Sequence, residues 1–198
     1  MENLNNKIAF FIDQNLRKVG NKNFAESQKK LIGKRIVSYG VRISEVRKIA
    51  RNYFRQFQEK EIDWLEIIKE LIMTKVLENQ MVGIFLLGHL IRTGRKITIS
   101  EIEKLIKKHI DNWATCDTMC SEVITRILEK TPKEIVTLFN WRNAKNKWLR
   151  RSLLVTVVKL KNKIENWQRV ALKILSSFST EEERIVKKAI HWLEREIN

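Results

Sequence analysis

Trp113 and Asp117 stand four residues apart in the stretch DNWATCDTMCSEVITRILEK, which runs from Asp111 to Lys130. The apolar residues recur with the period of a helix, so residues four apart share one face. The neighbours of the aspartate are small or apolar, and burying a carboxylate without a partner is costly. A carboxylate beside an indole can stabilise a positive charge. The pair predicts a site for cation chemistry; the alternative is a core tryptophan with a surface aspartate.

Arg151 and Trp192 are the residues whose types would complete such a site. Arg151 lies one turn into a later helix, at a place equivalent to that of Asp117 in a helical repeat. Trp192 stands late in the last helix, in VKKAIHWLERE. Arginine can pair with a half-buried carboxylate or hold a phosphate, but it stays protonated and cannot act as a base. We therefore expect Arg151 to hold charges in place and not to transfer protons.

The charge of the chain favours a polyanionic partner. The 39 Lys and Arg residues exceed the 23 Asp and Glu residues and leave a net charge of +16. Between Lys133 and Lys173, eleven basic residues stand against two acids, Glu134 and Glu165. Ordinary solvation of helix surfaces would place acids four residues from the bases, as in EEERIVKK. Their absence predicts nucleic-acid binding, with phosphates held by Lys, Arg and the N-terminal ends of helices.

The elements that must position these residues are helices. One Pro and six Gly in 198 residues leave little room for the turns of a β fold, and helical periodicity runs almost from end to end. About eleven helices in one domain over residues 1–198 are predicted. The predicted N-terminal caps are Asn112 or Asp111, Asn146, Thr131 before Pro132, Ser100 with Glu103, and Thr180 with Glu183.

The helices repeat in pairs. Inner helices are expected to begin near Glu78, Trp113, Trp148 and Glu183, a period of roughly 35 residues. The outer helices between them are expected near residues 62–75, 100–110, 132–141 and 165–177. This spacing predicts an all-α fold, an α-solenoid of HEAT-like helical repeats with a basic concave face for DNA. The alternative is a globular helical bundle.

Four stretches, spread over nearly the whole chain, resemble the AlkD-like DNA alkylation repair family, HEAT-like DNA glycosylases that excise alkylated purines. The stretches are YGVRISEVRKIARN from Tyr39, NWATCDTM from Asn112, NKWLRRSLLV from Asn146 and IVKKAIHWLERE from Ile185. The resemblance implies that Asp117, Trp113 and Trp192 are catalytic. It also implies that Arg151 contacts the lesion-bearing DNA, and the full set of predicted DNA contacts is Arg151, Arg150, Lys147, Lys187 and Lys188.

The function implied by this resemblance is hydrolysis of the N-glycosidic bond of cationic 3-methyl- and 7-methylpurines in duplex DNA, as in base excision repair. Members of this kind act without flipping the base, whereas most glycosylases flip it. The expected enzyme is monofunctional and needs neither metal nor cofactor. One alternative is a non-catalytic HEAT-like protein that binds damaged or branched DNA by shape. Another is a helical scaffold for protein partners.

The remaining sequence features concern the setting of the protein. Cys116 and Cys120 lack the partners of a zinc site and form no disulfide framework, so they are expected to be small buried residues. Neither a signal peptide nor a membrane span is evident. We expect a monomeric, cytoplasmic protein that associates with the nucleoid when bound to DNA. The sequence ends six residues after Trp192, and this short C-terminus is expected to weaken the hold on DNA.

Overall fold

The computed structural model of the chain describes residues 4–57 and 61–198. Helices make up the ordered elements in these ranges, where no β-strand is found and one isolated bridge joins Val37 to Val76. The predicted all-α class is confirmed. The chain divides into two compact units, Met1–Arg95 and Lys96–Asn198, and each is described by itself. The prediction of one domain over residues 1–198 stays a prediction.

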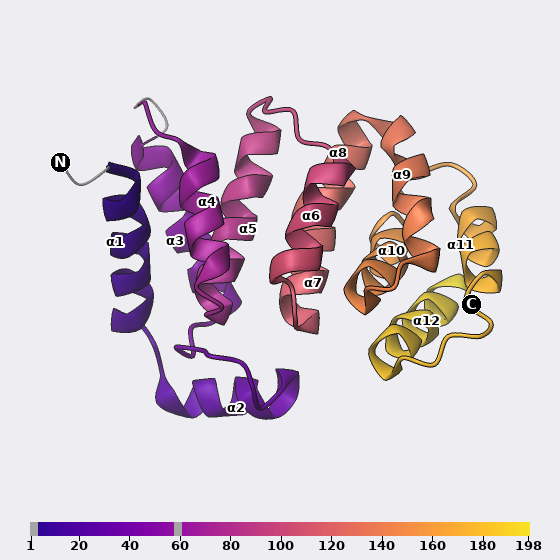
Figure 1. Cartoon of the computed structure of the whole chain (residues 1–198), viewed down its shortest axis with the longest axis horizontal. Helices are drawn as coiled ribbons and strands as arrows, with labels where there is room; N and C mark the ends of the chain where they lie inside the picture. Colours follow the sequence, from indigo (N-terminus) through magenta and orange to yellow (C-terminus); the bar gives the residue numbers. More distant parts are fainter. Residues whose placement is uncertain (1–3, 58–60) are drawn as a thin grey trace. The chain divides into compact units, whose positions relative to one another are not determined.

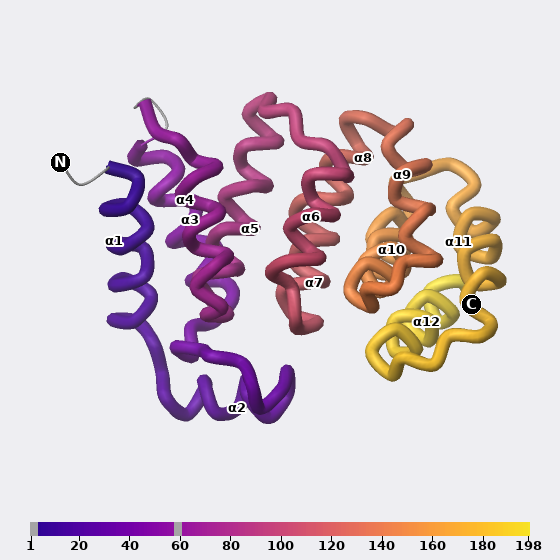
Figure 2. Tube along the Cα trace, viewed as in Figure 1, coloured from indigo at the N-terminus to yellow at the C-terminus, as the bar shows by residue number. Residues whose placement is uncertain are grey.

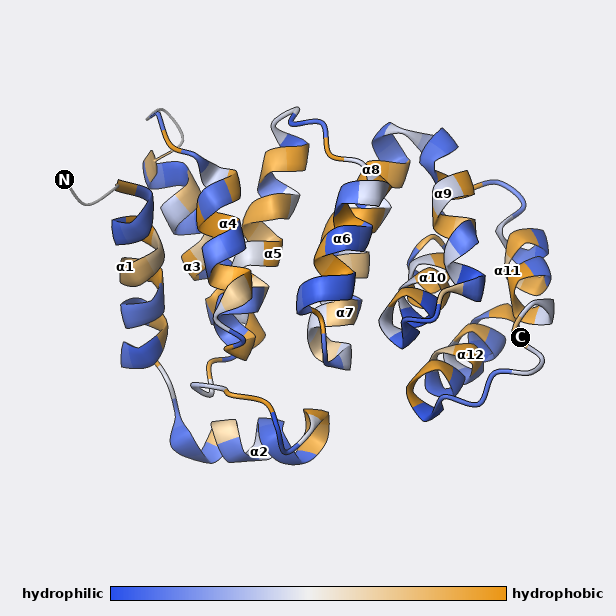
Figure 3. Ribbon diagram, viewed as in Figure 1, coloured by the Kyte–Doolittle hydropathy of each residue, from blue (hydrophilic) through white to orange (hydrophobic). Residues whose placement is uncertain are grey.

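Unit 1 is built around α5. Its helices are α1 (Leu4–Lys18), α2 (Lys22–Ile32), α3 (Ile43–Phe57), α4 (Trp64–Met73) and α5 (Leu77–Arg92). Helix α5 packs against α3 and α4 and is buried on nearly all sides, in keeping with its mostly hydrophobic colouring in Figure 3. Gly83 allows α4 to come close, because a Cβ atom there would lie 2.9 Å from Ile72 Cγ1. Helix α2 runs across the direction of α1 (Figure 1).

A buried carboxylate fixes the loop between α2 and α3. Glu78, which is 1% exposed, accepts hydrogen bonds from the Ser38 hydroxyl at 2.7 Å and from the N–H groups of Tyr39, Gly40 and Val41 at 2.9–3.1 Å. Gly40 has a φ of +78°, where a side chain would be strained. The loop therefore depends on one carboxylate and one glycine.

Unit 2 is built around α10. Its helices are α6 (Ile99–His109), α7 (Trp113–Met119), α8 (Thr125–Lys130), α9 (Ile135–Phe139), α10 (Lys147–Lys159), α11 (Trp167–Ser176) and α12 (Arg184–Ile197). Helix α10 packs against α7 and α12, and nearly every residue from Leu149 to Val158 is buried (Figure 1). The end of α12 lies beside α11, as the tube in Figure 2 shows.

A π-helical turn, Cys120–Ile124, joins α7 to α8. Its N–H bond from Thr125 to the carbonyl of Cys120 spans five residues instead of the four of an α-helix. The stretch from Trp113 to Lys130 is thus one helical rod with an extra residue inserted one turn after Asp117. Two short 3-10 turns, Pro132–Glu134 and Asn140–Asn143, flank α9.

The predicted N-terminal caps are confirmed where an asparagine precedes the helix. The Asn112 side chain accepts from the N–H of Thr115, and the Asn146 side chain accepts from the N–H groups of Trp148 and Leu149. The capping box of α6, by contrast, is formed by Thr98 with Glu101 and not by Ser100 with Glu103, because the buried Ile99 already belongs to the helix. The predicted box of Ser100 was therefore wrong by two residues.

Of the other two predicted caps, the first is right in position only and the second is wrong. Thr131 is the N-cap residue and Pro132 the first residue of the turn, as predicted. Thr131 makes no side-chain cap bond, since Pro132 begins a 3-10 turn and not an α-helix. Helix α12 begins at Arg184, and neither Thr180 nor Glu183 caps it through a side chain; the nearby Glu181 carboxylate is held by Arg150 and accepts from the N–H of Glu183.

The helix pairs follow the expected spacing. The predicted inner helices begin at Leu77, Trp113, Lys147 and Arg184, each within one residue of the predicted start. The outer positions are taken by α4, α6, the turns around α9, and α11. This succession fits an α-solenoid. Within the described ranges, no helix combines the length and the apolar character that a bilayer crossing requires.

Candidate functional site

Small side chains bring α7 close to α10. Cys116 Sγ lies 3.2 Å from the hydroxyl oxygen of Ser152, and Cys120 Sγ donates to the carbonyl oxygen of Ser152 at 3.5 Å. All three residues are 0% exposed. Burial raises the pKa of the Cys116 thiol, which therefore stays protonated and serves as a packing group. The predicted role of both cysteines as small buried residues is confirmed.

This packing places Asp117 against Arg151 in a two-point ion pair. Arg151 Nε donates to Asp117 Oδ1 at 2.9 Å, and Arg151 Nη2 donates to Asp117 Oδ2 at 2.7 Å. A third bond, from Arg151 Nη1 to the carbonyl oxygen of Ile185 at 2.7 Å, ties the same guanidinium to α12. The Arg151 side chain is 7% exposed and that of Asp117 is 18% exposed. The carboxylate is thus fixed by Arg151 on one side and keeps some contact with solvent on another.

The electrostatics of this pair follow from its burial. Burial raises the pKa of the Asp117 carboxyl, and the bonds from Arg151 and the positive charge of Lys159 oppose that rise. Burial lowers the pKa of Arg151, but the bonds to Asp117 outweigh it and raise that pKa. Both Asp117 oxygens accept hydrogen bonds, which is the bonding of an ionised carboxylate. Asp117 therefore carries a negative charge in the site, although its carboxyl group ionises less readily there than in water.

Trp192 is contacted by Lys159, a residue that the site prediction missed. Lys159 Nζ lies 4.6 Å from the centre of the Trp192 ring, and its charge opposes the rise that burial causes in the pKa of Asp117. The Trp192 ring is half-buried, and its Nε1 donates to Glu196 Oε1 at 3.2 Å. Lys159 follows Arg151 by two helical turns and shares its face of α10, so this spacing was the signal that would have found it.

Trp113 stands at the first position of α7, one turn before Asp117, and is half-buried. The helical spacing puts both on one face of α7. The structure therefore brings Asp117 and Arg151 into contact and ties Arg151 to α12, the helix that carries Trp192. Within the described ranges, no three His, Cys, Asp or Glu side chains gather as metal ligands.

The five predicted DNA contacts fall into two groups. The two arginines are engaged within the protein: besides the Asp117 pair of Arg151, Arg150 binds Glu181 at 2.6 and 3.1 Å and donates to the carbonyl oxygens of Ala144 and Lys145. The three lysines are exposed. These lysines are Lys147, which lies 3.7 Å from Glu183, and Lys187 and Lys188 on α12. Lys187 and Lys188 are therefore available to a polyanion and Lys147 shares its charge with Glu183, whereas Arg150 fixes the segment before α12.

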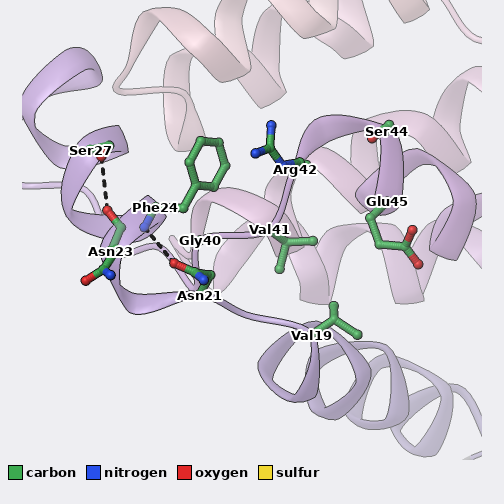
Figure 4. A pocket seen from close by; sticks show the side chains of 10 residues that line it. All are labelled: Val19, Asn21, Asn23, Phe24, Ser27, Gly40, Val41, Arg42, Ser44 and Glu45. Carbon is green, nitrogen blue, oxygen red and sulfur yellow. Dashed lines mark hydrogen bonds between the residues drawn. The ribbon is translucent and has the colours of Figure 1, made fainter.

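A cavity of about 500 Å³ lies in unit 1 and contains none of the predicted site residues. Its lining includes Asn21, Phe24, Arg42 and Glu45, and the guanidinium of Arg42 lies 5.4 Å from the centre of the Phe24 ring. Figure 4 shows these two side chains next to each other, with the Glu45 carboxylate directed away from them. The cavity thus belongs to unit 1 alone and adds no group to the Asp117 pair of unit 2.

Comparison with known proteins gives a family and a fold. The family model described as DNA alkylation repair enzyme matches residues 12–198. No curated protein matches the chain. Among solved structures, the chain is similar to a protein described as a predicted DNA alkylation repair enzyme from Enterococcus faecalis. The TM-score is 0.74 at 20% identity, over 90% of this chain and 83% of that one.

The two comparisons agree with the resemblance seen in the four sequence stretches. At 20% identity the solved structure supports the fold alone, whereas the family model covers all of α7, α10 and α12, from which Asp117, Arg151 and Trp192 come. With the helical fold and the family model in accord, the chain belongs to the DNA alkylation repair enzyme family.

Proposed function

We propose that this protein is a DNA glycosylase that releases cationic alkylated purines, of the 3-methyl and 7-methyl type, from duplex DNA. Membership of the family indicates the broader role, repair of alkylated DNA, with DNA as the partner. The observation that carries the narrower proposal is the Asp117 carboxylate, which Arg151 holds at two points while 18% of its side chain stays exposed.

The chemistry needs a negative charge beside the sugar. Alkylation at N3 or N7 makes the purine a cationic leaving group, and its departure leaves positive charge on the deoxyribose, as in glycoside hydrolysis. Asp117 stabilises that cation and orients a water, whose oxygen bonds to C1′ while its proton passes to solvent. One charge pair at about 4 Å in an effective dielectric near 20 contributes roughly 4 kcal/mol, or on the order of a thousandfold in rate.

Two tryptophans and one arginine support this step. Trp113 and Trp192 offer π faces to the cationic nucleotide, worth about 0.5–2 kcal/mol each. Arg151 acts first as a positioning residue for Asp117, and it has further N–H groups with which to meet a phosphate. The exposed Lys147, Lys187 and Lys188 supply the remaining phosphate contacts.

These groups stabilise the transition state only modestly. The proposed substrates are therefore purines whose N-glycosidic bond has already been weakened by alkylation. The proposal includes a monofunctional reaction, without a lysine nucleophile, metal or cofactor. It also includes attack on a base that stays in the helix, as the sequence resemblance implies. A monomer suffices, because Asp117, Arg151 and Trp192 come from one chain.

The experiment is release of 7-methylguanine and 3-methyladenine from methylated duplex DNA. Wild type releases free base, and Asp117→Asn is strongly impaired but still binds the duplex. Asp111→Asn is the matched control, because Asp111 is exposed just before the same helix. If wild type binds the DNA but releases neither base over a range of salt and temperature, the non-catalytic DNA-binding function replaces the glycosylase.

A further inference from the structure

Lys159 takes no part in the function proposed above, yet its ammonium lies inside the site. It is the last residue of α10, half-buried, with Nζ 4.6 Å from the centre of the Trp192 ring. Its charge is felt by Asp117 and by Glu196. A cation over an indole face, attracted by carboxylates farther away, resembles the arrangement that the proposed reaction requires of its substrate.

We propose that Lys159 is a resident cation: in the DNA-free protein its ammonium occupies the face of the Trp192 ring, and an incoming organic cation must displace it. The identity of that cation as an alkylpurine nucleotide rests on the proposed glycosylase function. The displacement itself rests on the geometry of unit 2. Lys159 is thereby a specificity-determining residue that keeps the site closed to small cations.

The neighbouring Lys161 shows why Lys159 is able to leave. The Lys161 ammonium donates to the carbonyl oxygen of Glu196 at 2.6 Å and to Glu196 Oε2 at 3.0 Å, so it is tied at two points. Lys159 forms no ion pair within 4 Å with a carboxylate of the described residues. Contact with the indole and a longer-range attraction hold it, and neither fixes the direction of the ammonium as the two bonds of Lys161 do.

DNA supplies the force that moves the ammonium. Lysine carries a point charge on a flexible four-carbon stem, so its head can swing from the ring to a phosphate. Two cations cannot share one ring face without repulsion, and a duplex offers phosphates together with the cationic base. A free cationic nucleoside offers no phosphate and must compete with Lys159 directly. The resident cation therefore favours lesions within DNA over free alkylated bases.

The test uses the full chain and a flat permanent cation, 1-methylnicotinamide, with uncharged nicotinamide as its counterpart. Binding is followed by quenching of tryptophan fluorescence, and Trp192→Phe identifies the part that arises from Trp192. Lys159→Met keeps the stem and removes the charge, so it should bind the cation about 3- to 30-fold more tightly than wild type. Lys159→Arg, which retains a cation, should show no gain.

Lys163→Met is the matched control, because it removes the same charge from a lysine that pairs with Glu129 at 2.7 Å. The proposal is overturned if Lys159→Met binds 1-methylnicotinamide no better than wild type. It is also overturned if Lys163→Met or binding of nicotinamide gains equally, since either result is a general effect. This test measures binding of the cation and not release of a base. The proposal for Lys159 and the glycosylase proposal can therefore fail independently of each other.

Discussion

Glu78 in unit 1 and Asp117 in unit 2 are both carboxylates near the start of an inner helix, and their surroundings differ completely. Glu78 is 1% exposed and accepts four hydrogen bonds, three from backbone N–H groups and one from a serine hydroxyl. Asp117 meets one guanidinium, and 18% of its side chain stays exposed. The first carboxylate is enclosed by neutral donors, whereas the second is charged against an arginine on one side and open on the other.

The difference separates structural use of a carboxylate from chemical use. Hydrogen-bond donors surround Glu78 and leave it inaccessible to a ligand, so its hydrogen bonds stabilise the α2–α3 loop. Arg151 orients Asp117 but leaves part of it accessible, so that a positive charge can still approach. The solvent exposure of the carboxylate, more than the identity of its partner, distinguishes Asp117 as the candidate for catalysis.

The largest expected effect comes from removing the charge at the open carboxylate. Asp117→Asn should lower the single-turnover rate of alkylpurine release by about a thousandfold, because the cation on the sugar loses its counter-charge. Rates are compared at a temperature where circular dichroism shows the variant folded. A rate within tenfold of wild type would remove Asp117 from the chemistry.

The same change at the enclosed carboxylate should act on stability alone. In Glu78→Gln the amide NH₂ faces donors, and the free energy of unfolding should fall by about 2–4 kcal/mol, a change of up to several hundredfold in the folding equilibrium. Urea denaturation measures it. The rate of base release per folded molecule should stay within about threefold of wild type. A rate loss as large as that of Asp117→Asn would erase the distinction between the two carboxylates.

Replacing the partner of Asp117 should give an intermediate effect. Arg151→Lys keeps the charge but loses the two-point pair, so kcat should fall by about 10- to 100-fold with little change in KM for DNA. Arg150→Lys is the matched control, because its partner is Glu181 and its loss should appear mainly in stability. A rise in KM without a fall in kcat would show instead that Arg151 acts chiefly on a phosphate.

The smallest expected effect is that of pH, which should change the rate of base release and the free energy of unfolding in opposite directions. Burial places the pKa of Asp117 above its ordinary value of 3.8, so the folded state binds the proton more tightly than the unfolded chain. The contribution of Asp117 to stability therefore falls as pH rises from 3.8 through the folded pKa, while base release rises through that pKa. Below it, the rate should drop by about tenfold per pH unit. A flat pH–rate profile would contradict an ionised Asp117.

Much of the architecture could be predicted because its determinants are local. The starts of α7 and α10 follow Asn112 and Asn146, whose side chains reach N–H groups two or three residues on. The capping box of α6 was misplaced because Thr98 with Glu101 and Ser100 with Glu103 both fit the pattern. Only the burial of Ile99, which depends on neighbouring helices, decides between them.

The contacts of the site depend on residues far apart in the sequence, and there prediction was partial. Arg151 was expected near Asp117, but its bond to the carbonyl oxygen of Ile185 depends on the packing of α12. The Arg150–Glu181 pair joins residues 31 positions apart, and no local pattern marks it. Lys159 was counted among the basic residues, and only the placement of the Trp192 ring shows where its charge lies.

The π-helical turn at Cys120–Ile124 separates two tasks within one rod. Each residue turns an α-helix by about 100°, so one inserted residue changes the direction in which everything before it faces. The inserted residue thus sets the angle between the half of the rod that carries Trp113 and Asp117 and the half in which Ile127 and Leu128 are buried. Deleting or adding one residue in this turn would rotate Asp117 away from Arg151 and Cys116 away from Ser152 together, so the ion pair and the packing of α7 on α10 depend on the same inserted residue.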